Sequence, residues 1–203
     1  MEFSITKKAS NLSRGLFIVG LISIIIGVAL NYDSEHFATR LLGSGLANAF
    51  FFFALGLGAL FFLALNYATE AGWYAVVKRV IESVALYLPY GIGALALVLL
   101  IISFMKGAHI YLWMDDHFIH TDKIIEGKTP YLNVVFFWIR TVVYFTVYLL
   151  FLRGFRKRSL LEDQEGGTNL HFTNYRKGAL FLVFFAVFSS TSAWDWIMSI
   201  YIH

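Results

Sequence analysis

Apolar residues occupy long, uninterrupted stretches of this chain, and polar residues are confined mainly to the shorter segments between them. Five stretches are long enough to cross a bilayer as helices, and they cover residues 15–32, 41–67, 84–105, 131–152 and 178–201. A hydrocarbon core of roughly 30 Å needs about 20 helical residues. The stretches are continuously apolar rather than alternating, which predicts five transmembrane helices and excludes a transmembrane β-barrel.

The composition agrees with a membrane protein. Of the 203 residues, 59% are hydrophobic and 14% are charged, whereas a soluble domain averages about 45–50% apolar and about 25% charged residues. We therefore predict an all-α integral membrane protein with a single membrane domain over residues 1–203. The absence of cysteine excludes disulfides, thiolate-bound iron–sulfur clusters and covalently attached c-type haem.

Lysine and arginine gather on alternate connections between the predicted helices. The N-terminal segment, the second connection and the fourth connection together hold eleven of these residues, and the segments on the opposite side hold four. Because cytoplasmic segments carry the excess of positive charge, the N-terminus is predicted to be cytoplasmic. The fourth connection, residues 153–177, is interpreted as a solvated loop, with contact to anionic lipid as the alternative.

The third apolar stretch contains a proline. Pro89 lacks an N–H and would clash with the carbonyl group of Ala85, so a kink is predicted. The simpler interpretation is a bend that eases packing. The alternative is that the freed carbonyl group and the hydroxyl groups of Tyr87 and Tyr90 line a polar cavity.

The second stretch contains small residues at a spacing that favours close contact between helices. Gly43 with Ala47, and Ala54 with Gly58, form two pairs separated by three residues. Such pairs let helix backbones approach each other in membranes. We interpret both pairs as structural.

Two ionisable residues lie within the predicted spans, where such residues are rare and usually functional. Arg140 is roughly 14 Å from the outer boundary of the fourth span at ~1.5 Å per residue, and it needs a partner or a water-filled cavity. Asp195 lies in the outer part of the fifth span, and Arg140 is deeper by roughly 9–10 Å. Asp195 forms one polar stripe with Thr191, Ser192 and Ser199.

Two interpretations of this stripe remain open. In the first, the stripe faces the interior of the helix bundle, where Arg140 and a bound water would approach Asp195 and form the outer end of a proton path. The alternative places Asp195 among the headgroups, within an aromatic belt formed by Trp194 and Trp196.

A third carboxylate lies at the cytoplasmic edge of the third span. Lys78 and Arg79 precede Glu82 by four and three residues, a spacing that predicts an ion pair on the helix surface. From spacing alone this structural interpretation is favoured.

Histidine and aspartate give little support for a bound cofactor. All six histidines lie outside the five stretches or at their ends, whereas a membrane haem needs axial histidines within the helices. The segment that contains His109, His117 and His120, with Asp115, Asp116 and Asp122, matches no reliable metal-ligand spacing. We interpret it as an outward-facing docking loop, and no nucleic-acid signature is visible.

Two short segments resemble a known family. AGWYAVVKRVIESV (residues 71–84) and WDWIMSI (residues 194–200) are similar to segments of the NrfD/polysulfide-reductase-like membrane subunits, and most of all to the F subunit of bacterial alternative complex III. In this family a tryptophan followed by an arginine and a glutamate begins one helix, and an Asp-Trp-(Ile/Leu)-Met-Ser segment ends another. The matching positions are Trp73, Arg79, Glu82, Asp195, Trp196, Met198 and Ser199.

The resemblance implies a cofactor-free membrane subunit of a respiratory quinol oxidoreductase in the bacterial inner membrane. Haem c and iron–sulfur centres would belong to partner subunits, and this subunit would support quinol binding or proton conduction. Glu82 would then be a cytoplasmic proton-uptake group. Family members have eight to ten spans in two bundles, so we expect these 203 residues to be the first part of a longer polypeptide, with spans two to five as one four-helix bundle.

Two other functions remain open. The chain could be half of a secondary transporter, with Arg140 and Asp195 at its substrate site, or a purely structural scaffold. A tightly bound redox partner would favour the oxidoreductase, and solute movement by the isolated chain would favour the transporter.

Overall fold

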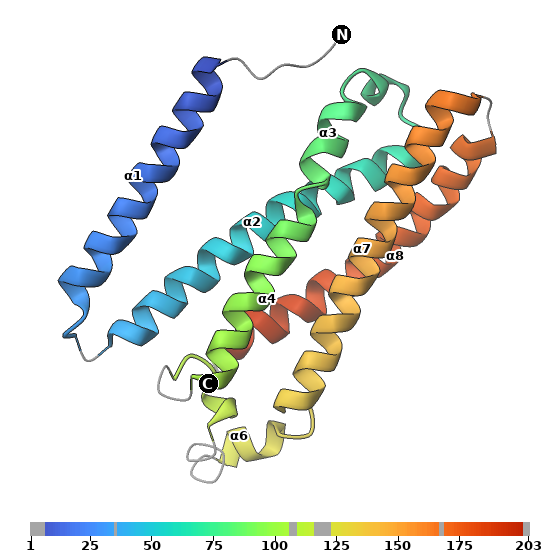
Figure 1. The fold of residues 1–203 in the computed structure, drawn as a ribbon. Coiled ribbons are helices and arrows are strands. Elements are labelled where there is room, and N and C mark those ends of the chain that lie inside the picture. Colours follow the sequence, from blue (N-terminus) through green and yellow to red (C-terminus); the bar gives the residue numbers. More distant parts are fainter. Residues whose placement is uncertain (1–6, 35, 106–108, 116–122, 167–168, 201–203) are drawn as a thin grey trace. The chain divides into compact units, whose positions relative to one another are not determined.

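The structure is a computed structural model that describes residues 7–34, 36–105, 109–115, 123–166 and 169–200. Five helices in it are long and apolar enough to cross a membrane (Figure 1), and no strand occurs among the described residues. The prediction of an all-helical chain with five such helices is confirmed. The chain divides into two compact units, residues 1–41 and 42–203.

The first unit consists of helix α1 (Lys7–Asn31) and the beginning of α2 (Phe37–Ala68). None of the described residues of α1 is buried. Its polar side chains bond back to its own backbone: the Ser23 hydroxyl donates to the Val19 carbonyl at 2.8 Å, and the Asn31 amide donates to the Gly27 carbonyl at 2.9 Å. Such internal bonds satisfy polar groups without help from water.

The second unit is a four-helix bundle. Its long helices are α2 from Leu42 onward, the pair α3 (Lys78–Ala85) and α4 (Leu88–Phe104), α7 (Val134–Glu165) and α8 (Asn169–Trp196). Short elements connect or follow them, namely η1 (Gly72–Val76), η3 (Leu112–Met114), α6 (Lys123–Lys128) and η4 (Met198–Ile200). The bundle that we expected for spans two to five is therefore present, whereas its orientation in a membrane stays a prediction.

Aromatic rings fill the centre of the bundle. Phe53 of α2 packs against Phe145, Tyr148 and Trp196 at ring-centroid distances of 5.5–6.2 Å. All four side chains are buried. These tilted and edge-to-face contacts join three helices around one centre, and aromatic pairs of this kind add about 0.5–1.5 kcal/mol each to the stabilisation from burial.

Glycines let the helices cross closely, but not the ones that the sequence suggested. A Cβ atom on Gly56 of α2 would lie 2.8 Å from the Leu88 Cα atom, and one on Gly91 of α4 would lie 2.8 Å from the Phe53 Cα atom. A Cβ atom on Gly178 of α8 would lie 2.7 Å from the Ala64 carbonyl oxygen. Backbone therefore meets backbone at these three points.

The assignment of Gly43 with Ala47 and of Ala54 with Gly58 to close packing was wrong. A Cβ atom on Gly43 or Gly58 would meet nothing within 4 Å, and Ala47 and Ala54 are exposed. These residues lie on the outer face of α2 in the described structure. The close contacts use the next face of the same helix, where Gly56 lies.

The predicted irregularity at Pro89 is an interruption of the helix. Helix α3 ends at Ala85, Leu86 and Tyr87 form a turn, and α4 begins with Pro89 in its first turn. A proline at that position costs no hydrogen bond, because the first N–H groups of a helix have no intrahelical partner. The exposed fractions of Tyr87 and Tyr90 are 40% and 72%, so these tyrosines do not line a buried cavity within this bundle, and a polar cavity shared with another segment stays a prediction.

Candidate functional site: two buried ion-pair clusters

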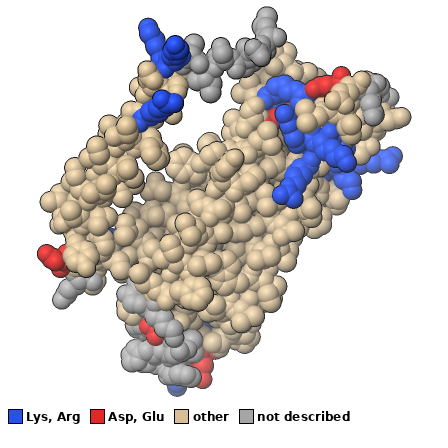
Figure 2. All heavy atoms as spheres, in the orientation of Figure 1, with Lys and Arg blue, Asp and Glu red and all other residues tan. Residues whose placement is uncertain are grey.

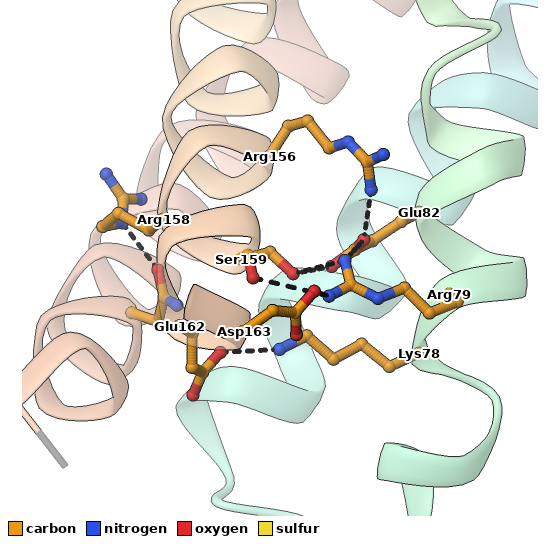
Figure 3. A network of polar contacts seen from close by, with 9 residues as sticks. Lys78, Arg79, Glu82, Arg156, Arg158, Ser159, Glu162 and Asp163 are labelled. Atoms are coloured by element: carbon orange, nitrogen blue, oxygen red, sulfur yellow. Dashed lines mark hydrogen bonds and ion pairs between the residues drawn. The ribbon is translucent and has the colours of Figure 1, made fainter. Parts of the chain in front are cut away.

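The first cluster surrounds Glu82 on α3. Its carboxylate is 2% exposed and accepts from Arg79 Nη1 at 2.6 Å and from Arg156 Nη1 at 2.7 Å, both at Oε2. The Ser159 hydroxyl donates to Oε1 of the same carboxylate. Arg156 and Ser159 both belong to α7, so the carboxylate ties α3 to α7 (Figure 3).

Additional charges complete this cluster on its outer side. Arg79 Nη2 contacts the Asp163 carboxylate, and Lys78 Nζ lies 2.7 Å from Glu162 Oε2. Arg79 Nη1 also donates to the Ser159 hydroxyl at 3.0 Å. We call the set the Glu82 cluster, which comprises Lys78, Arg79, Glu82, Arg156, Ser159, Glu162 and Asp163.

The structure confirms one part of the prediction for Glu82 and corrects two others. The ion pair with Arg79 is present, but Lys78 pairs with Glu162 instead. Glu82 does not lie on an exposed helix surface, because α7 covers it. A carboxylate in such a place needs charged partners, and the two arginines meet that need.

The second cluster joins α7 to the end of α8. Arg140 Nε and Nη2 lie 2.8 Å from Asp195 Oδ2 and Oδ1, respectively, in a bidentate ion pair. The Asp195 side chain is completely buried and the Arg140 side chain is 11% exposed. The two residues contact each other directly, so no bridging water is needed between them. Bidentate pairs of this kind are the strongest and most directional ion pairs in proteins.

Aromatic residues hold both partners of this pair. Arg140 Nη1 donates to the Tyr131 carbonyl oxygen at 3.1 Å, and its guanidinium lies 4.0 Å from the centre of the Tyr131 ring and 4.2 Å from that of Phe136. The Tyr144 hydroxyl donates to Asp195 Oδ2 at 3.2 Å. We call this set the Asp195 cluster, which comprises Tyr131, Arg140, Tyr144 and Asp195.

The polar stripe on α8 faces the bundle interior, as one of the two interpretations predicted. Ser192, Asp195 and Ser199 are buried, and Thr191 is half-buried. The Ser199 hydroxyl donates to the Asp195 carbonyl oxygen, whereas Thr191 and Ser192 bond to backbone oxygens of their own helix. Within the stripe, Asp195 makes the ion pair that joins α8 to α7.

The alternative that placed Asp195 within an aromatic belt was wrong. Of the two tryptophans that flank Asp195, Trp194 is exposed and Trp196 is completely buried. Trp196 Nε1 donates to the Thr141 hydroxyl at 3.1 Å. The Tyr111 hydroxyl donates to the Trp196 carbonyl oxygen at 2.7 Å. Burial, followed by the charge of Asp195, raises the pKa of Tyr111, which keeps this phenol protonated and able to donate.

An open pocket adjoins the Asp195 cluster. Its volume is about 470 Å³, and its lining is Gly127, Lys128, Pro130, Tyr131, Leu132, Trp194, Met198 and Ser199. Tyr131 belongs to both the pocket and the cluster and stacks on Arg140. Ser199 bonds to the Asp195 backbone. The pocket therefore reaches the residues next to the Arg140–Asp195 pair, but Asp195 itself does not line it.

Helix α7 carries both clusters. Arg140 and Ser159 are 19 residues apart in the sequence, which is roughly 28 Å along a helix at ~1.5 Å per residue. Between them lies Tyr148, which is completely buried and whose hydroxyl group has no hydrogen-bond partner among the described residues. A buried hydroxyl group of this kind is usually satisfied by an internal water.

The structure brings together residues that no local pattern linked. Arg156 and Ser159 are 74 and 77 residues from Glu82 in the sequence, and Tyr144 is 51 residues from Asp195. Sequence reasoning missed all three, and the spacing of tyrosines and arginines along the fourth span was the one available signal.

The predicted docking loop lies largely outside the described residues, which exclude His117, His120, Asp116 and Asp122. His109 Nδ1 lies 3.3 Å from Asp115 Oδ2. Within the described part of the chain, no group of three or more His, Cys, Asp or Glu side chains is placed to hold a metal ion. No family model and no curated protein matches the chain.

Proposed function

We propose that this chain is a cofactor-free membrane subunit of a respiratory quinol oxidoreductase, in which the bundle conducts protons between the Glu82 cluster and the Asp195 cluster. The oxidoreductase assignment, with haem and iron–sulfur partners in a bacterial inner membrane, rests on the resemblance of residues 71–84 and 194–200. The proton role rests on one structural observation. Two completely or almost completely buried carboxylates lie at the two ends of α7, each held by arginine.

The loss of a counter-charge would help a carboxylate take up a proton, and the contacts of Arg79 support such an exchange at Glu82. Arg79 contacts Glu82 and Asp163 with different guanidinium nitrogens, and Asp163 is exposed. If Arg79 turns fully toward Asp163, Glu82 keeps Arg156 as its cation. Glu82 would then have one cationic partner in place of two. We therefore propose Glu82 as the group that takes up protons.

Asp195 is proposed as the group at the release end. Its cluster shares Tyr131 with the lining of the open pocket, so a released proton has a short way to water. Tyr144 and Tyr148 lie on one face of α7 on the way from Asp195 toward Glu82. The unpartnered Tyr148 hydroxyl supports an internal water between the clusters.

The contacts of Arg140 favour this function over half of a transporter. Asp195 occupies two of its nitrogens and the Tyr131 carbonyl oxygen a third. A substrate site needs charged groups that are available to the solute, whereas these two residues satisfy each other.

Proton uptake by the assembled complex tests the proposal. In reconstituted vesicles, Glu82→Gln should lower the number of protons moved per electron while quinol oxidation continues, and Glu82→Asp should restore part of the loss. Glu162→Gln is the matched control, because Glu162 belongs to the same cluster but is more exposed than Glu82. An unchanged proton-to-electron ratio in Glu82→Gln would contradict the proton role. Purification without any haem or iron–sulfur partner would contradict the oxidoreductase assignment separately.

A further inference from the structure

A cleft lies between α7 and α8, on the other side of α7 from the Glu82 cluster. Its volume is about 220 Å³, and its lining is Leu150, Phe151, Gly154, Arg158 and Lys177. Figure 3 shows Arg158 pointing away from Glu82, on the opposite side of α7 from Arg156. Two cations and two large apolar side chains therefore share one concave site.

Arg158 is held so that it reaches into this cleft. Its Nε donates to Asn174 Oδ1 on α8 at 2.6 Å, and its guanidinium lies 5.2 Å from the centre of the Phe155 ring. A Cβ atom on Gly154 would lie only 3.1 Å from Arg158 Nη1. The side chain thus folds back along α7 toward the apolar stretch, and the glycine leaves the room for it.

The positive charge of the cleft is not neutralised by the described part of the chain. Arg158 and Lys177 have no ion pair with any described carboxylate. Glu162 and Asp163, which follow Arg158 closely in the sequence, bind Lys78 and Arg79 instead. Three other cations near this end are exposed and do not line the cleft, namely Arg153, Lys157 and Arg176. Figure 2 shows basic side chains gathered at this end of the bundle with few acidic ones among them.

We propose that the cleft binds the headgroup of an anionic phospholipid. The two cations match a phosphate, which arginine binds with paired N–H donors. Leu150 is exposed on the side of the apolar span, and Leu180 and Phe184 of α8 are also exposed there, so the acyl chains would lie against them. A small inorganic anion would make no use of these apolar walls, whereas a membrane lipid presents both chemistries at the level where a span meets its polar end. This inference does not depend on the proposed proton role.

Stabilisation of the purified protein by added lipid tests the proposal. Phosphatidylglycerol should raise the unfolding temperature in detergent, and phosphatidylcholine or inorganic phosphate at the same ionic strength should not. Lys177→Gln should weaken the response about fivefold in lipid concentration, since one cation near an anionic lipid contributes about 1 kcal/mol. Gly154→Leu should abolish it without any change in charge, because the new side chain fills the cleft and displaces the Arg158 guanidinium.

Two matched variants control for charge and for the glycine substitution. Arg176→Gln removes an exposed cation next to Lys177 that does not line the cleft, and Gly58→Leu adds the same side chain to a helix where a Cβ meets nothing within 4 Å. Both should keep the wild-type response. The proposal is overturned if Lys177→Gln and Gly154→Leu respond like these controls, or if phosphatidylcholine or inorganic phosphate stabilises the protein as well as phosphatidylglycerol.

Discussion

Asp195 accepts two parallel hydrogen bonds from Arg140 in a place from which solvent is excluded. Removing both charges from water is costly, and the attraction between them offsets that cost only while the geometry stays good. The tyrosine hydroxyl and the stacked rings around the pair keep it so. The intact pair therefore adds little net stability, whereas the loss of one partner leaves a buried charge without a counter-charge and strongly destabilises the protein.

Arg140→Gln should destabilise the protein by about 3–5 kcal/mol, because it leaves the Asp195 carboxylate buried without a cation. The double variant Arg140→Gln/Asp195→Asn should be less destabilised than Arg140→Gln alone, since neither charge then remains. Reversible unfolding in mixed micelles would measure both free energies. The single variant Asp195→Asn completes the comparison. If the loss of stability in the double variant equals the sum of the losses in Arg140→Gln and Asp195→Asn, the pair does not act as a unit.

The residues of this pair could be predicted from the sequence, but their contact could not. Arg140 and Asp195 stand out because each is a charge within an apolar stretch. Their separation was estimated by counting residues along straight spans, and such a count neither fixes how far the Arg140 side chain reaches nor locates the helix ends. Helix α8 begins at Asn169, nine residues before the predicted span. Glu82 was even less predictable, because nothing in its local sequence reveals which turn of α7 covers it.

At the scale of elements, α2 and α4 cross where two glycines leave their backbones in contact. Gly56→Ala would place a Cβ atom 2.8 Å from the Leu88 Cα atom, and a backbone atom cannot move aside as a side chain can. We expect a loss of roughly 1–3 kcal/mol from the displaced helix. Gly58→Ala should have no such cost and should gain up to about 1 kcal/mol from helix propensity.

The same micelle unfolding assay compares these two alanine variants. Equal stabilities for Gly56→Ala and Gly58→Ala would contradict a backbone contact at Gly56. The pair is well matched because the residues lie two positions apart on one helix and differ mainly in the face that they occupy.

The choice between these glycines illustrates why packing was harder to predict than the helices themselves. Helix α2 is apolar on all sides, so the pattern that normally distinguishes the buried face from the outer face is absent. Small residues at Gly43, Ala47, Ala54 and Gly58 have the right spacing but the wrong face. By contrast, Pro89 marked the interruption between α3 and α4 correctly, because the missing N–H acts locally and needs no knowledge of neighbours.

At the scale of the whole second unit, charge lies toward the ends of the bundle and aromatic rings lie between. The Glu82 cluster and the cleft beside Arg158 share the end formed by α3, the last turns of α7 and the first turns of α8. The Asp195 cluster lies at the opposite end of α7. The pattern of apolar stretches predicted five helices, and the positions of lysine and arginine predicted that the basic connections lie on one side. It could not predict that acidic residues of the fourth connection would serve as partners for Lys78 and Arg79.

The ion pair at Asp195 also has a consequence for the order in which the protein is made. Ribosomal synthesis produces Arg140 55 residues before its counter-charge, so α7 reaches the insertion machinery with an arginine that nothing yet neutralises. Such a residue raises the apparent insertion free energy by roughly 2.5–3.5 kcal/mol. Glycosylation mapping should therefore find that α7 inserts less completely in a chain truncated before α8 than in the full chain. Arg140→Leu should remove that difference, and equal insertion of both wild-type chains would show that the arginine enters without waiting for its partner.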